Sequence, residues 1–350
     1  MKIKSKLINR TDMRASILTI ISLITFILYA QLGCANAQEN QWLQFQPTQS
    51  NGKHIVLISG DEEYHSEESL PMLAKILATH HGFKTTVLFS IDPETGNIDP
   101  TYQNNIPGLS NLTSADLIII ATRFRELPDE QMKYIDEYLK AGKPVIGLRT
   151  ATHAFNFGNK MKDSPYAKYG YSSKQAGWES GFGKQVLGET WIDHHGQHGK
   201  EGTRGLMNGL SKREGNPILN GVTDIWVPSD VYAINDLVAE DEVLVWGQVT
   251  KGMTAESEGS WEKEIMPVAW TKSYSIESGK KGKAFTTTMG SSIDLLNEDL
   301  RRLIVNACYW AVDLSDKIPE KSNVEFVGSY EPLMFGFGTF KKGLKPNDYK

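Results

Sequence analysis

Three of the eight histidines in this 350-residue chain lie within five residues of one another. They are His194, His195 and His198, in a segment that begins at Trp191. Imidazole accepts or donates protons near neutral pH and is also a frequent ligand of divalent metals. The adjacent Gly196 indicates a loop, so the spacing leaves three interpretations open: acid–base chemistry, a metal site and a solvated loop without function.

Three apolar runs, residues 54–59, 117–121 and 144–148, are typical of buried parallel strands, and each breaks into polar side chains. In an open α/β sheet, ligands bind beyond the carboxyl ends of the strands. We therefore expect the side chains that follow these runs to meet at one edge of the sheet. They are Asp61, Glu62, Glu63 and His65 after the first run, Arg123 and Arg125 after the second, and Arg149, Thr150 and His153 after the third.

The elements that must position these side chains follow a strand–helix alternation. Apolar residues at intervals of three and four predict helices over 67–79, 128–141 and 295–314. Further apolar runs predict strands over 85–89, 243–249, 266–274 and 284–289. This order favours an α/β fold with a mainly parallel sheet and helices on both of its faces. A long insertion, 158–216, interrupts the domain at 54–316, and an irregular tail, 317–350, follows it.

The first 37 residues have the composition of a secretory signal peptide, with basic residues, an apolar run and a small-residue end at Ala35-Asn-Ala37. We expect cleavage after Ala37, a polar leader over 38–53, and a periplasmic or secreted protein. A lipoprotein attached through Cys34 is the alternative, and a permanent membrane anchor ranks third because the apolar run is short for a span. After cleavage we expect no stable membrane span.

Charge and cysteine content exclude some classes of function. The signal segment carries five basic residues and one acidic residue, so the net charge of −5 becomes −9 in the mature chain. A strongly acidic protein is a poor nucleic-acid binder. Cys308 is then the one remaining cysteine, so no disulfide forms within the mature chain, and its place in an apolar helical stretch argues against a cysteine nucleophile.

Several separated motifs resemble the ThuA-like, trehalose-utilisation family over residues 54–314. They are Tyr64-His65-Ser66, Gly188-Glu-Thr-Trp191-Ile-Asp-His194, Asp230-Val-Tyr232 and Pro267-Val-Ala-Trp270. The resemblance implies the flavodoxin-like fold of the class I glutamine amidotransferase-like superfamily. The chain departs from the family at two positions where the family has a histidine. Arg149 stands at the first of them, and Ser291, after Gly290, stands at the second. The elbow after residue 148 lacks the amidotransferase cysteine, so glutamine hydrolysis is not expected.

The resemblance implies an exported protein that acts on 3-keto sugars or glycosides, by enolisation followed by elimination, isomerisation or hydrolysis. On this hypothesis His194 or His195 is the base, His153 or His65 is the partner acid, and Arg149 with Arg123 stabilises the oxyanion. The substrate is a small-molecule sugar. We expect further contacts to it from Glu62, Arg123, Arg125, Trp191, Gln197, Asp230 and Tyr232.

Two alternatives remain open at this stage. The first is a non-catalytic carbohydrate- or partner-binding module on the same fold. The second is a metal-dependent hydrolase in which His194, His195 and His198 hold a divalent metal, since no motif calls for another cofactor. The sequence leaves the oligomeric state open.

Overall fold

A computed structural model describes residues 41–158, 161–206, 215–277 and 279–350 of the chain. The predicted signal peptide and Cys34 lie outside the described residues. Residues Trp42–Lys350 form one compact unit, and the description below concerns that unit alone. Among the described residues, no helix is both long enough and apolar enough to cross a membrane.

Five parallel strands form the centre of the sheet, in the spatial order β3-β2-β4-β5-β10. Their apolar runs are short, and β2 and β4 are buried along their whole length, as expected for strands covered on both faces. The bounds are β2 (His54–Gly60), β3 (Lys84–Leu88), β4 (Leu117–Thr122), β5 (Val145–Leu148) and β10 (Gly282–Thr287).

The other strands of the ten-stranded sheet pair antiparallel, so the expectation of a mainly parallel sheet is wrong. Four of the nine strand pairings are parallel and five are antiparallel. The antiparallel strands are β1 (Trp42–Phe45) at one edge, and β9 (Met266–Tyr274), β8 (Glu242–Val249), β6 (Thr203–Leu206) and β7 (Trp226–Val227) on the other side. The strands β8, β9 and β10 follow one another in the chain and pair as hairpins, which makes neighbouring strands antiparallel.

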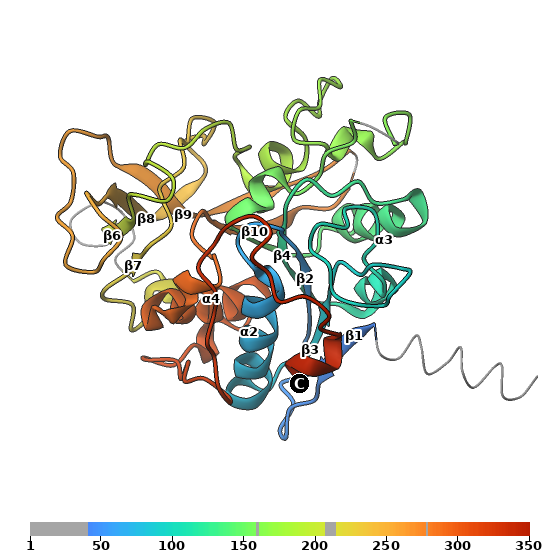
Figure 1. Cartoon of the computed structure of the whole chain (residues 1–350), viewed down its shortest axis with the longest axis horizontal. Coiled ribbons are helices and arrows are strands. Elements are labelled where there is room, and N and C mark those ends of the chain that lie inside the picture. Colours follow the sequence, from blue (N-terminus) through green and yellow to red (C-terminus); the bar gives the residue numbers. More distant parts are fainter. Residues whose placement is uncertain (1–40, 159–160, 207–214, 278) are drawn as a thin grey trace, which may run out of the picture. The chain divides into compact units, whose positions relative to one another are not determined.

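Helices cover both faces of the parallel strands, as predicted. Alternate side chains of β2 point to opposite faces. Ile55 and Leu57 pack in one apolar cluster with α2 (Ser66–His81) and α4 (Glu298–Ala311), whereas Val56 and Ile58 pack with α3 (Asp129–Lys140). Figure 1 shows α2 and α4 in front of the sheet. The fold is therefore a three-layered α/β arrangement around a mixed sheet.

Three local features differ from the predicted elements. The strand β1 lies within the predicted leader and pairs with β3, and β6 lies within the predicted insertion. The predicted helix over 295–314 is interrupted, because the side chain of Asn297 accepts a hydrogen bond from the backbone N–H of Leu300 and starts α4 at Glu298. Cys308 is buried in α4.

Candidate active site

The carboxyl ends of β2, β4 and β5 meet at one edge of the sheet, as the sequence predicts. Three residues beyond these ends have left-handed backbones although they are not glycine: His65 (φ 54°), Phe124 (φ 52°) and Arg149 (φ 44°). Such conformations are costly and persist where the surrounding structure enforces them, often at functional sites. The backbone is therefore strained at three neighbouring strand ends.

Asp61 joins the ends of β2 and β5. Its Oδ1 accepts hydrogen bonds from the backbone N–H groups of Glu63 (2.9 Å) and Tyr64 (3.0 Å), which form a tight turn. Its Oδ2 accepts from the hydroxyl of Thr150 at 2.5 Å. This buried carboxylate consequently fixes the position of the acidic turn relative to Arg149.

Arg123, after β4, is held by two acidic side chains of that turn. Its Nη1 donates to Oε1 of Glu62 at 2.6 Å, and its Nε lies 3.3 Å from Oε2 of Glu63. Burial, followed by the charge of Asp61, raises the pKa of Glu63. Arg123 keeps a partly exposed side chain, and its Nη2 has no hydrogen-bond partner among the described residues.

Arg125 faces the protein interior. Its guanidinium donates to Glu62, to Ser90 and to the backbone oxygen of Pro100, and its side chain is fully buried. These contacts consume its donors and position Glu62. The structure therefore places Arg125 behind Glu62, in the protein interior and not at the surface of the cluster.

Arg149 is also buried, in contact with Asp230. Its Nη1 donates to the backbone oxygens of Asp230 (2.6 Å) and Thr288 (2.8 Å), and its Nη2 donates to Oδ1 of Asp230 (2.8 Å) and to the Tyr64 hydroxyl (3.0 Å). The guanidinium lies over the rings of Tyr64 and Tyr232. Since both Nη atoms are occupied, Arg149 positions Asp230.

Asp230 contacts the two histidines of the 191–198 segment that point inward, His194 and His198. Its Oδ2 lies 2.6 Å from Nδ1 of His194, and its Oδ1 lies 3.1 Å from Nδ1 of His198. Burial alone would raise the pKa of Asp230, but Arg149 and the two imidazoles hold it well below its usual range. The carboxylate is therefore ionised and orients both rings.

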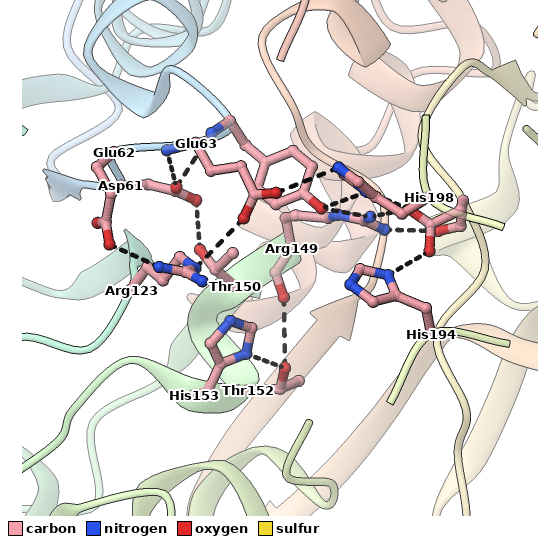
Figure 2. A network of polar contacts seen from close by, with 12 residues as sticks. Asp61, Glu62, Glu63, Arg123, Arg149, Thr150, Thr152, His153, His194 and His198 are labelled. Carbon is pink, nitrogen blue, oxygen red and sulfur yellow. Dashed lines mark hydrogen bonds and ion pairs between the residues drawn. The ribbon is translucent and has the colours of Figure 1, made fainter. Parts of the chain in front are cut away.

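His198 also contacts the acidic turn. Its Nε2 lies 3.3 Å from Oε1 of Glu63, so a carboxylate faces each of its ring nitrogens. The hydrogen bond to Asp230 raises the pKa of His198. His194 instead has a single carboxylate partner, and its side chain is 29% exposed. The other ring nitrogen of His194 points into the cluster (Figure 2).

His153, just past β5, is a buried imidazole beside these groups. Burial and the positive charges of Arg123 and Arg149 hold the pKa of His153 well below its ordinary value, so the ring is neutral. Its Nδ1 lies 3.3 Å from the Thr152 hydroxyl. Its ring packs on Trp191, which also contacts His194. The two imidazoles thus contact the same indole.

We refer to Glu63, His153, His194, His198 and Asp230 as the cluster. Three predicted site residues are turned away from it. His195 directs Nε2 to the backbone oxygen of Glu264 at 2.8 Å, and Gln197 is exposed. His65 is buried beneath the C-terminal segment, where Nδ1 contacts Glu67 (3.2 Å) and Nε2 contacts the Thr339 hydroxyl (2.9 Å). None of these three contacts Asp230 or His153 among the described residues.

The structure adds residues that the sequence did not single out as site residues, namely Glu63, Tyr64 and Phe335. Glu63 belongs to the acidic turn, and Tyr64 to a motif of the resemblance, so a signal existed for both. Phe335 packs on Tyr64 and His198 from a part of the chain that follows them by more than 130 residues. Only the Phe-Gly-Phe-Gly pattern from Phe335 onward singles out that segment.

A neighbouring apolar cavity does not contain the cluster. This cavity has a volume of about 420 Å³ and is lined by Trp226, Pro228, Met253, Leu296 and Met334, together with three other residues. None of the predicted site residues lines it. Met334 lines the cavity, whereas the next residue, Phe335, packs on His198. Perturbed ionisable groups and converging donors therefore locate the site better than cavity size does.

Comparison with known proteins agrees with the sequence motifs. The profile of the ThuA family, described as trehalose utilisation, matches residues 54–311. No curated protein sequence matches the chain. Similar solved structures include ThuA-like proteins of Parabacteroides merdae (15% identity, 75% of this chain and 90% of that chain, TM-score 0.47) and Bacteroides uniformis (13%, 75% and 92%, TM-score 0.44). Because the family profile covers well over half of its length, the chain belongs to the ThuA, trehalose-utilisation family.

Proposed function

We propose that this protein acts on 3-keto sugars or 3-keto glycosides by removing the acidic C–H next to the carbonyl. A carbohydrate-related role follows from the family. The observation that carries the proposal is the pair of Asp230 and His194. Because Asp230 accepts the Nδ1–H of His194 at 2.6 Å, the lone pair lies on Nε2, the nitrogen that points into the cluster.

His153 is suited to the complementary step. A neutral imidazole can donate a hydrogen bond to an enolate and can carry a proton to the leaving group. The proposal assigns proton abstraction to His194 and proton donation to His153. Arg123, with a free Nη2, and the buried charge of Arg149 stabilise the negative charge that develops on the enolate oxygen. His195, which the sequence left as an alternative base, serves as the matched control.

The test compares methyl 3-keto-glucoside with methyl glucoside by NMR, using the wild type, His194→Ala and His195→Ala. We expect turnover of the keto sugar alone, lost in His194→Ala and kept in His195→Ala. Equal turnover by the two variants would reject His194 as the base. Shifted substrate signals without product in the wild type would favour the alternative, a carbohydrate-binding module.

A divalent metal is the second candidate, and a specific observation favours it. One ligand atom from each of His194, His198 and Asp230 lies within 4.8 Å of the others. Two imidazoles and a carboxylate leave positions open for substrate, as in catalytic metal sites. Glu63 facing Nε2 of His198 matches the outer carboxylate that commonly orients a metal-bound histidine. The predicted ligand set changes accordingly, with Asp230 in place of His195.

Such a metal would supply Lewis-acid activation of a carbonyl or a bound water. Metal content of the purified protein and a Zn²⁺ titration by calorimetry test the site. The metal account expects one equivalent to bind to the wild type and to His195→Ala, with binding lost in His198→Ala. Equal Zn²⁺ binding by all three proteins would reject it.

We further propose export through the predicted signal peptide, with Cys34 lipidation as the alternative. Mass spectrometry of the mature protein distinguishes an N-terminus at Gln38 from a lipid on Cys34. The order of the five parallel strands supports the flavodoxin-like assignment of the central sheet.

A further inference from the structure

The C-terminal segment Leu333–Thr339 crosses the strand ends and is fastened there by backbone hydrogen bonds. The N–H of Gly336 donates to the backbone oxygen of Glu63 at 2.8 Å, and the N–H of Leu333 donates to Oε2 of Glu68 at 2.8 Å. His65 contacts both the Met334 backbone oxygen (3.2 Å) and the Thr339 hydroxyl. The segment is therefore a fixed part of the site wall.

Two phenylalanines of this segment have contrasting environments. Phe335 is buried, with its ring centroid 5.4 Å from that of Tyr64 and 5.2 Å from that of His198. Phe337, two residues later, is 61% exposed. Its ring centre lies 5.0 Å from the guanidinium carbon of Arg123, whose nitrogens also contact Glu62 and Glu63. Phe337 thus stands at the rim of the cluster with most of its surface in water.

Arg123 is enclosed by aromatic rings and acidic groups that fix its orientation. Phe124 contacts the same guanidinium at 4.5 Å, and Phe124 in turn packs on His153. The chain of contacts Phe337–Arg123–Phe124–His153 leads from the exposed rim to the neutral imidazole. A preorganised aromatic face next to a free guanidinium N–H is the combination that recognises a sugar ring, since the ring has an apolar C–H face and hydroxyl groups at its edge.

We propose that Phe337 is a stacking platform for the second ring of a disaccharide substrate, the pyranose that is linked to the oxidised sugar. Arg123 Nη2 carries two N–H bonds, of which one donates to a hydroxyl of this ring and the other faces the enolate oxygen. This inference rests on the proposed function, because it takes the cluster around His194 and His153 as the place of the oxidised ring. It specifies the substrate class further: the protein prefers a keto-disaccharide to a keto-sugar with a methyl aglycone.

The test uses 3-keto-trehalose and methyl 3-keto-α-glucoside with the wild type, Phe337→Ala and Phe340→Ala. Phe340 is the matched control, because it follows this segment directly but its ring faces Lys342 and a different cavity. We expect Phe337→Ala to raise KM for the disaccharide about 10-fold. Phe337→Ala leaves KM for methyl 3-keto-α-glucoside within about twofold, and Phe340→Ala leaves both KM values unchanged. Phe337→Tyr restores the wild-type KM for the disaccharide.

The outcomes separate this inference from the proposed chemistry. If the wild type turns over both substrates and Phe337→Ala changes neither KM, or changes both equally, the platform is rejected while the chemistry stands. If the wild type binds the disaccharide without turnover and Phe337→Ala weakens that binding alone, the platform stands while the chemistry is rejected.

Discussion

Arg149 contacts Asp230 twice, through the backbone oxygen at 2.6 Å and through Oδ1 at 2.8 Å. Both side chains are almost completely buried. The arginine occupies the strained position directly after β5. The strained backbone directs its guanidinium inward, where it orders the carboxylate that orients His194 and His198.

We therefore predict a large loss of stability when Arg149 is replaced by methionine. A buried carboxylate that loses its ion-pair partner costs about 3 kcal/mol of unfolding free energy. Urea denaturation measures this change. The control is Arg204→Met, which removes the more exposed pair with Asp224 and costs less than about 1 kcal/mol. Similar losses in the two variants would contradict the role given to Arg149.

A second prediction concerns the link between β2 and β5. Thr150→Val keeps the shape of the side chain but removes the hydroxyl that donates to Asp61. Leaving this buried carboxylate oxygen without its donor should cost about 1–3 kcal/mol. Thr95→Val, which removes a comparable bond to Asp92 in an exposed loop, should change stability little. Thermal unfolding of both variants makes the comparison, and a Thr150→Val protein as stable as Thr95→Val would argue against a joining role for Asp61.

The sequence could predict which strand ends carry the polar site residues, because strand ends are marked by local signals. Three short apolar runs, each followed by charged residues such as Glu62, Arg123 or Arg149, marked three strand ends. The parallel pairing of β2, β4 and β5 brings these ends together. The periodicity of α2 and α3 was equally clear. The strands β8 and β9 were predicted, but their antiparallel pairing was not, because an apolar run has the same composition whichever direction its neighbour runs.

Side-chain direction could not be predicted from spacing. His194 and His195 are adjacent, yet one contacts Asp230 and the other the Glu264 backbone, because successive side chains of an extended segment point to opposite sides. The burial of Arg149 depends on Tyr64 and Tyr232, which come from distant segments. Phe335 and Phe337 were missed for the same reason.

A third prediction concerns acid stability and His81, away from the site. Its Nε2 donates to the backbone oxygen of Asn323 at 2.7 Å, and burial lowers the pKa of His81 to about 4. The unfolded chain has a pKa near 6.5 and takes up the proton first as pH falls. Stability is therefore full above pH 6.5, declines between pH 6.5 and 4, and is lower by roughly 3 kcal/mol below that window.

His81→Gln removes the titrating ring and keeps a donor for the Asn323 backbone oxygen. We expect a flatter dependence of unfolding free energy on pH between 4 and 6.5 in this variant, measured by urea denaturation at several pH values. His80→Gln, at the adjacent and partly exposed position, should keep the wild-type slope. An unchanged slope in His81→Gln would show that other groups set the acid stability.

The most direct test of the central claim is exchange of the C2 proton of methyl 3-keto-α-glucoside with D₂O, followed by NMR. This exchange reports enolisation by itself, whatever bond breaks afterwards. The account predicts rapid exchange with the wild type and with His195→Ala, and a rate at least about 100-fold lower with His194→Ala and with Asp230→Asn. If the C2 proton exchanged no faster with the wild-type protein than without it, the result would contradict the account.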